Sequence, residues 1–239
     1  MTHTDPQHLN LDAEEIAKFN ALASRWWDPE GDFRPLHDIN PARLAYIQER
    51  SKLGDGAAID VGCGGGILTE ALAQVCSPVT GIDMAEKALG VARLHALEQG
   101  REIDYVCTTA EQYAEDHAAG FRTVTCLEML EHVQSYPSTV QACADMCEPG
   151  GDVFFSTINR NARAYAMLVI GAEYLLKLLP RGTHDYAKFI RPSELCGAIT
   201  DAGLEVCDIS GLSYNPFSHK CAIVANVDTN YIVHAHKPH

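Results

Sequence analysis

The sequence predicts an α/β protein with a doubly wound, mainly parallel sheet that ends in an antiparallel hairpin. Two observations lead to this prediction. From residue 57 onward, short segments rich in Val, Ile, Thr and Phe alternate with helical patterns, which is typical of parallel strands joined by right-handed crossovers. After residue 203 the pattern changes to two consecutive strand-like segments joined by a short Pro-containing turn, which indicates a hairpin.

The elements follow from hydrophobic periodicity. The parallel strands are expected at 57–62, 78–83, 104–109, 122–129 and 151–158. Helices are expected between them at 67–76, 85–99, 110–117 and 138–147, and again at 191–203 before the hairpin strands at 204–216 and 219–228. Residues 11–28 have the pattern of an amphipathic helix, with Ile16, Phe19, Leu22 and Trp26 on one stripe.

Composition excludes several classes of function. The formal net charge of −14 argues against general nucleic-acid binding, because phosphate backbones need a basic surface. The nine cysteines contain no C-x-x-C pair, so neither a zinc ribbon nor a dithiol redox motif is indicated. The polar, acidic start of the chain has no signal-peptide or transit-peptide character. These features predict a cytoplasmic protein with reduced thiols.

The stretch "AIDVGCGGGILTEAL" contains the most specific motif, Asp60-x-Gly62-x-Gly64-x-Gly66, between a predicted strand and a predicted helix. Glycines let a backbone turn sharply and approach a ligand closely. An acid at position 60 is unfavourable beside a phosphate but suits the positive charge of a methyl donor. Asp83 ends the next strand, where a carboxylate can accept both ribose hydroxyls. The motif therefore resembles the S-adenosylmethionine site of class I methyltransferases, with a Rossmann-like sheet.

The fourth predicted strand runs into "CLEMLEHV", which places Glu128, Glu131 and His132 at the edge of the sheet where ligands bind. Two functional interpretations stay open. The three side chains are candidate ligands for Mg²⁺, which would orient and acidify a catechol. Alternatively, His132 acts as a general base. A solvated turn with a structural histidine is the non-functional alternative.

Residues 160–190 form an insert after the fifth strand, with an apolar centre and basic flanks. The apolar residues include Leu175 and Leu176, and the basic ones include Arg160, Lys177 and Lys188. Such a segment can lie on an anionic membrane surface. A lid packed over the active site would also be apolar, and the two interpretations are compatible. His184 in "GTHD" is a second candidate base, and Trp26 and Trp27 are candidates for closing the pocket.

Longer motifs carry a closer resemblance. "EEIAKFNALASRWWDPEGDFRPLHDINPARLAYI", "CEPGGDVFFSTINRN" and "GTHDYAKFIRPSEL", together with the motifs above, resemble the bacterial ubiquinone-biosynthesis O-methyltransferases over nearly the whole chain. The resemblance implies O-methylation of 2-polyprenyl-6-hydroxyphenol and 3-demethylubiquinol. It also implies that the protein contacts the anionic inner face of the cell membrane and other enzymes of the pathway.

The resemblance assigns further residues. It places Arg43, Gly62, Asp83 and Leu127 at the methyl donor, and we expect Asp60, Gly64, Met84 and Ala110 beside them. It also implies a divalent metal at Glu128, Glu131 and His132, as in eukaryotic relatives. The chain then divides into an N-terminal helical cap, 1–50, and a methyltransferase domain, 51–239, that includes the insert.

Overall fold

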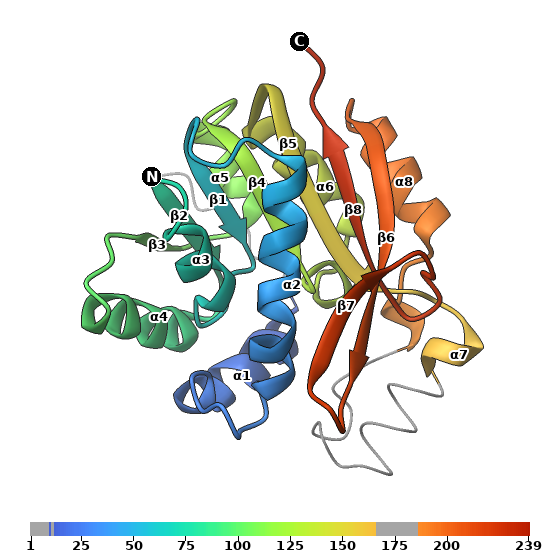
Figure 1. Ribbon diagram of the computed structural model, residues 1–239. Coiled ribbons are helices and arrows are strands. Elements are labelled where there is room, and N and C mark those ends of the chain that lie inside the picture. Colours follow the sequence, from blue (N-terminus) through green and yellow to red (C-terminus); the bar gives the residue numbers. More distant parts are fainter. Residues whose placement is uncertain (1–9, 11, 166–185) are drawn as a thin grey trace.

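The computed structural model describes residue 10 and residues 12–165 and 186–239. Within these residues the strands form one eight-stranded sheet in the order β3-β2-β1-β4-β5-β8-β6-β7 (Figure 1). Its parallel half comprises β1 (Ala58–Val61), β2 (Val79–Asp83), β3 (Asp104–Cys107), β4 (Phe121–Leu127) and β5 (Cys147–Ile158). The antiparallel half comprises β6 (Glu205–Asn215), β7 (Lys220–Val224) and β8 (Asn230–His236).

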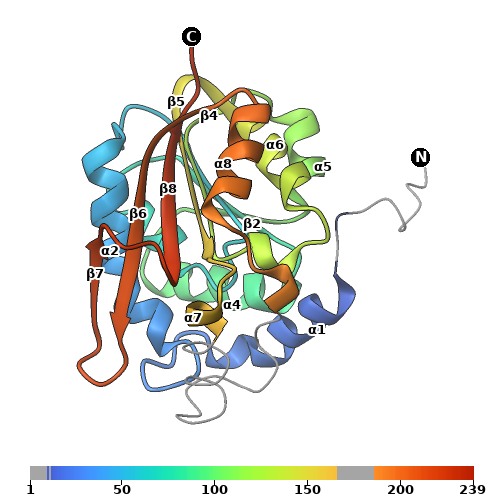
Figure 2. The same cartoon turned by 90° about the vertical axis from the view of Figure 1, so that its right-hand side faces the viewer.

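Helices lie on both faces of the sheet (Figure 2). One face packs against α2 (Arg34–Arg50) and α3 (Ile67–Leu72), and the other against α6 (Tyr136–Met146) and α8 (Pro192–Asp201). The remaining helical segments are α1 (Ala13–Leu22), η2 (Ala23–Arg25), α4 (Glu86–Glu98), α5 (Ala110–Asp116), η3 (Leu130–His132), α7 (Ala162–Ala164) and η5 (Tyr186–Lys188). Throughout the described ranges, no helix combines the length and the apolar character needed to cross a bilayer.

The fold class, the parallel strands and the C-terminal hairpin confirm the prediction, but the way the sheet closes does not. The predicted hairpin is β6–β7, yet it does not pair with β5. An unpredicted strand, β8, lies between β5 and β6 and runs antiparallel to both. Residues Tyr231–Ala235 are all buried. This strand therefore lacks the alternation of polar and apolar positions from which a strand is predicted. The helix expected at 11–28 is also shorter, because α1 ends at Leu22.

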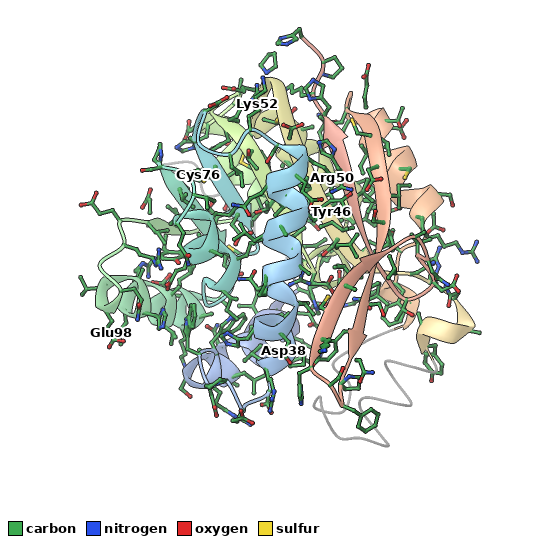
Figure 3. All side chains as sticks on the ribbon, in the orientation of Figure 1. Asp38, Tyr46, Arg50, Lys52, Cys76 and Glu98 are labelled. Atoms are coloured by element: carbon green, nitrogen blue, oxygen red, sulfur yellow. The ribbon has the colours of Figure 1, made fainter. Side chains whose placement is uncertain are left out.

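Helix α2 is tied to strand β6 near both of its ends. Figure 3 labels the α2 residues that take part, Asp38, Tyr46 and Arg50. Tyr46 donates a 2.5 Å hydrogen bond to Asp208 of β6, and the guanidinium of Arg50 lies 3.7 Å above the Tyr46 ring. Nearer the start of the helix, Tyr214 of β6 donates a 2.7 Å hydrogen bond to Asp38. These contacts hold the middle of α2 in place, where it faces the functional site.

Candidate active site

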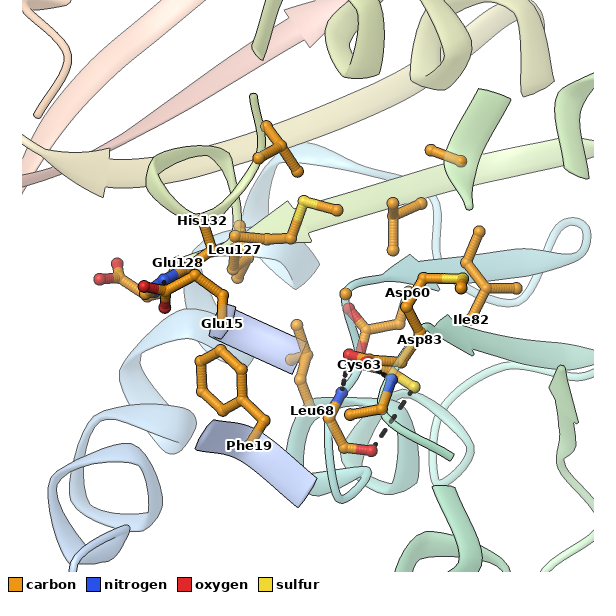
Figure 4. A pocket seen from close by; sticks show the side chains of 18 of the residues that line it. Glu15, Phe19, Asp60, Cys63, Leu68, Ile82, Asp83, Leu127, Glu128 and His132 are labelled. Carbon is orange, nitrogen blue, oxygen red and sulfur yellow. Dashed lines mark hydrogen bonds and ion pairs between the residues drawn. The ribbon is translucent and has the colours of Figure 1, made fainter. Parts of the chain in front are cut away.

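A cavity opens at the carboxyl ends of β1, β2 and β4, where the sequence places the functional motifs (Figure 4). Figure 4 shows Asp60, Cys63 and Asp83 at one end and Glu15, Glu128 and His132 at the other, with apolar side chains between them. All of the residues predicted to lie at the methyl donor line this cavity: Arg43, Asp60, Gly62, Gly64, Asp83, Met84, Ala110 and Leu127. The fold therefore brings the two predicted halves of the site together.

The glycine loop has the backbone that only glycine adopts without strain. Gly62, Gly64 and Gly66 have φ angles of 74°, 53° and 88°. The segment that follows α1 also packs against this loop. A Cβ on Gly64 would lie 2.1 Å from Cζ2 of Trp26, and Trp27 Nε1 donates a 2.8 Å hydrogen bond to the carbonyl of Gly65. These glycines thus make room for an indole as well as for a ligand.

Asp83 ends β2 at the cavity wall, as predicted. Its carboxylate accepts 2.8 Å and 2.7 Å hydrogen bonds from the backbone N–H groups of Gly64 and Ala85. Burial raises the pKa of Asp83. A carboxylate has about four lone-pair sites, so Asp83 retains acceptor capacity for ligand hydroxyls. It therefore both shapes the glycine loop and presents acceptors to the cavity.

Asp60 is buried at the end of β1, between two threonines. Thr69 and Thr125 donate hydrogen bonds of 2.7 Å and 2.8 Å to its two oxygens. Burial nevertheless raises the pKa of Asp60 to about 6. Its ionised form is therefore poorly compensated by the protein alone, which is the condition that a cationic ligand would relieve.

Asp60→Asn is expected to stabilise the ligand-free protein at pH 7. The folded-state pKa of about 6 exceeds the ordinary aspartate value of 3.8. Ionisation therefore costs the folded state stability as the pH rises from about 4 to 6, by at most about 3 kcal/mol above that range. Thermal unfolding should show a higher Tm for Asp60→Asn at pH 7 and little difference at pH 4, where the folded wild-type carboxyl is protonated.

The exposed variant Asp55→Asn is the control and should not change the Tm at either pH. An Asp60→Asn protein that is equally destabilised at both pH values would contradict the assignment.

Arg43 lies in the middle of α2 and is only 5% exposed. Its Nη2 is 3.0 Å from Oε1 of Glu128. This contact is an ion pair but not an aligned hydrogen bond, so the buried Nε and Nη2 both lack a hydrogen-bond acceptor among the described residues. Unsatisfied buried donors are costly, so these groups indicate a place for an anionic ligand group in the cavity. Sequence reasoning alone treats Arg43 as a surface charge on a helix.

The cluster "EMLEH" is split by the structure. Glu128 and His132 line the cavity, but Glu131 does not; it is buried and accepts a 2.8 Å hydrogen bond from Thr157. Burial and the nearby Glu128 charge raise the pKa of Glu131 to about 7. In the part of the chain that the structure describes, no three His, Cys, Asp or Glu side chains are arranged as a metal site.

His132 has a partner that the sequence did not suggest, Glu15 of α1. His132 Nδ1 lies 2.9 Å from Glu15 Oε2, and the Phe19 ring packs edge-on against the imidazole at 5.2 Å. Burial alone lowers the pKa of His132, but the Glu15 hydrogen bond and the charges of Glu131, Glu15 and Glu128 outweigh burial and raise it. The same hydrogen bond lowers the pKa of Glu15 to about 2.

The described C-terminal end of the insert contacts the start of α1. Lys188 of η5 lies 2.7 Å from the carboxylate of Asp12 and 3.8 Å from that of Glu15. Both acidic residues line the cavity. The second candidate base, His184, and the apolar centre of the insert, including Leu175 and Leu176, lie outside the described residues.

Comparison with known proteins shows the family to which the chain belongs. Residues 37–209 match the family described as a methyltransferase domain. The chain is 56% identical to the ubiquinone biosynthesis O-methyltransferase of Saccharophagus degradans, over 97% of this chain and 98% of that protein. It is 59% identical to the protein of the same name from Pseudomonas paraeruginosa, over 94% of this chain and 97% of that one.

Solved structures are similar in fold. The magnesium protoporphyrin IX methyltransferase of Synechocystis, solved with bound S-adenosylhomocysteine, aligns with a TM-score of 0.69 at 18% identity over 93% of this chain and 97% of its own. The N-methyltransferase NodS of Bradyrhizobium japonicum aligns with a TM-score of 0.63 at 15% identity, over 95% and 98% of the two chains. Given the sequence identities above, this chain belongs to the family of ubiquinone biosynthesis O-methyltransferases.

Proposed function

We propose that this enzyme transfers a methyl group from S-adenosylmethionine to a phenol hydroxyl of polyprenylated rings in ubiquinone biosynthesis. The proposed acceptors are 2-polyprenyl-6-hydroxyphenol and 3-demethylubiquinol. The observation that carries the proposal is that the Glu15–His132 pair lies in the same cavity as the glycine loop and Asp83. A base and a donor site in one cavity are what phenol methylation requires.

The residues present fit the methyl donor. When bound, S-adenosylmethionine supplies an electrophilic methyl group on a positively charged sulfonium. Arg43 offers unsatisfied N–H groups to the donor carboxylate, and Asp83 offers acceptors to the ribose hydroxyls. Asp60 contributes negative charge at the same end of the cavity as Asp83. Met84, Ala110 and Leu127 supply the adjoining walls.

His132 is the proposed general base. Because the pKa of Glu15 is about 2, its carboxylate is ionised at neutral pH and can only accept a hydrogen bond. His132 Nδ1 therefore carries the proton, which leaves the lone pair of neutral imidazole on Nε2. Nε2 takes the phenol proton as the oxygen attacks the methyl group. Glu15 then stabilises the imidazolium that forms.

The residue set implied for Mg²⁺ does not fit a divalent cation in this arrangement. Such a site needs oxygen ligands that converge on one point. The Glu128 oxygens already contact Arg43, Ser156 and Asn230, and Glu131 faces Thr157 away from the cavity. We therefore derive no step through a metal ion.

We further propose that the segments around the active site have distinct roles in substrate capture. The helices before β1, within residues 1–50, act as a cap on the methyltransferase domain. The apolar and basic insert, 160–190, docks on anionic lipid at the inner face of the cell membrane, where polyprenylated rings reside.

Flotation with anionic vesicles tests the membrane proposal. The wild-type protein should float with the vesicles, and Leu175→Glu with Leu176→Glu should reduce its binding because each charge opposes insertion. Equal binding of both proteins, or no binding by either, would overturn it.

Methyl transfer itself is tested with labelled S-adenosylmethionine and each polyprenylated ring. The expected product is the phenol methyl ether, and its formation should depend on an intact hydroxyl. Donor binding without any methyl ether, from either ring, would identify the chain as a binding protein and overturn the proposal.

A further inference from the structure

We propose that Glu128 is a positioning residue, which holds Arg43 ready for the carboxylate of the methyl donor. This inference rests on the proposed function, because it assigns the donor as the ligand of Arg43. It departs from the sequence interpretation of Glu128 as a metal ligand. Its evidence is the backbone of Glu128, the three protein contacts of its carboxylate and the unsatisfied N–H groups of Arg43.

The backbone of Glu128 is in the left-handed region, with φ at 54°. Few residues other than glycine adopt this conformation, because it costs about 1–3 kcal/mol and persists only where the surroundings enforce it. Here Ser156 of β5 enforces it, because the Glu128 N–H lies 3.0 Å from the Ser156 carbonyl and 3.1 Å from its hydroxyl oxygen. The strained backbone at the end of β4 thus fixes the orientation of the Glu128 side chain.

The carboxylate of Glu128 reaches three elements at once. Ser156 Oγ donates a 2.8 Å hydrogen bond to Oε1, and Asn230 of β8 donates a 3.1 Å hydrogen bond to Oε2. Arg43 of α2 contributes its Nη2, 3.0 Å from Oε1. Each oxygen therefore has a protein partner, which suits a fixed anchor better than a group that must exchange a proton or bind a cation.

Arg43 is the member of this network that remains incomplete. Its side chain is 6% exposed, and its Nε and Nη2 lack a hydrogen-bond acceptor among the described residues although Nη2 lies close to Glu128. Glu128 thus compensates the charge of Arg43 without using all of its donors. Arginine N–H groups match a carboxylate well, and the donor's methionine moiety carries one. Removal of Glu128 would leave a buried cation unpaired and free to reorient.

The test measures binding in the absence of turnover. Isothermal titration gives the Kd of S-adenosylhomocysteine and of its decarboxylated analogue, which lacks the group that Arg43 would bind. Glu128→Gln removes the carboxylate charge with little change in the shape of the side chain. Asn230→Ala removes the hydrogen bond that β8 donates to Oε2 of Glu128. Glu131→Gln is the control for binding, because Glu131 lies only three residues after Glu128 but does not line the cavity.

Glu128→Gln should weaken S-adenosylhomocysteine binding by about 10-fold or more, as expected for a charged hydrogen-bond network. Asn230→Ala should weaken it in the same direction but less. The decarboxylated analogue should change by less than about two-fold in either variant. In an Arg43→Ala background, Glu128→Gln should have no further effect, because coupled residues are not additive. Glu131→Gln should bind both ligands like wild type.

Two results would overturn the inference. In one, Glu128→Gln binds S-adenosylhomocysteine normally but loses turnover, which would place Glu128 in the chemistry. In the other, both ligands weaken equally, which would mean that Glu128 shapes the cavity without acting through Arg43. These measurements report binding and do not depend on turnover. If the variants show the expected binding pattern but the wild-type protein methylates neither ring, only the proposed function is overturned.

Discussion

His132→Ala is expected to lower kcat by about 10²- to 10⁴-fold, the range typical for loss of a general base. The imidazole lines the cavity, and its Nδ1 is held 2.9 Å from Glu15, so its other nitrogen is available to a phenol. Because His132 is not assigned to the donor, the Kd of S-adenosylhomocysteine should stay within about two-fold. Steady-state kinetics and calorimetry together measure this separation. Retained turnover in His132→Ala would remove the histidine from the mechanism.

Glu15→Gln tests the partner of the same histidine. Hydrogen bonding to Glu15 and the Glu15 charge both raise the pKa of His132. Without that charge the pKa of His132 falls, and the neutral, basic form persists to lower pH. The rise of kcat with pH should therefore shift to lower pH, while kcat at its maximum decreases. An unchanged pH profile would show that Glu15 is not coupled to the base.

Gly64→Ala is expected to abolish measurable donor binding and to lower the Tm as well. The new Cβ would lie 2.1 Å from Trp26 Cζ2, and the φ of 53° is strained for alanine. Trp26 is buried and stacks on Phe33 with 4.0 Å between ring centroids, so it cannot yield easily. Displacing it would loosen the segment that covers the cavity.

Gly90→Ala is the matched control. Gly90 lies in α4, and its added Cβ would meet nothing within 4 Å. Alanine is favoured over glycine inside a helix by roughly 0.5–1 kcal/mol, so this variant should bind the donor normally and gain stability. A Gly64→Ala protein with lost affinity but an unchanged Tm would mean that the glycine serves the ligand alone and not the packing of Trp26.

The parts of the structure that depend on local sequence were predictable. The parallel strands and the glycine loop are encoded in short segments with clear periodicity, and both were found where expected. Strand β8 was missed because it is buried on both faces and pairs with strands distant in sequence. The residues predicted for the methyl donor line one cavity together with Glu128 and His132. Glu131 does not line it, and its position three residues after Glu128 in the sequence gives no sign of that.

The partners of the site residues were not predictable, for a physical reason. Glu15 and His132 are 117 positions apart, and Glu128 and Asn230 are 102 apart. Such pairs form only when the cap and β8 pack against the parallel sheet, and an acidic residue at the start of a helix has no pattern that distinguishes this role. The need for glycine at position 64 was also only partly predictable, because Trp26 lies against the glycine loop only in the folded protein.

The most direct test of metal-free base catalysis by His132 is a crystal structure with S-adenosylhomocysteine and a catechol analogue, determined with and without Mg²⁺. We expect a catechol oxygen within about 2.6–3.2 Å of His132 Nε2, facing the donor sulfur, in both crystals. We also expect the donor carboxylate on Arg43, with Glu128 still bound to Arg43. A catechol oxygen bound instead to a cation held by Glu128, Glu131 and His132 would contradict this mechanism.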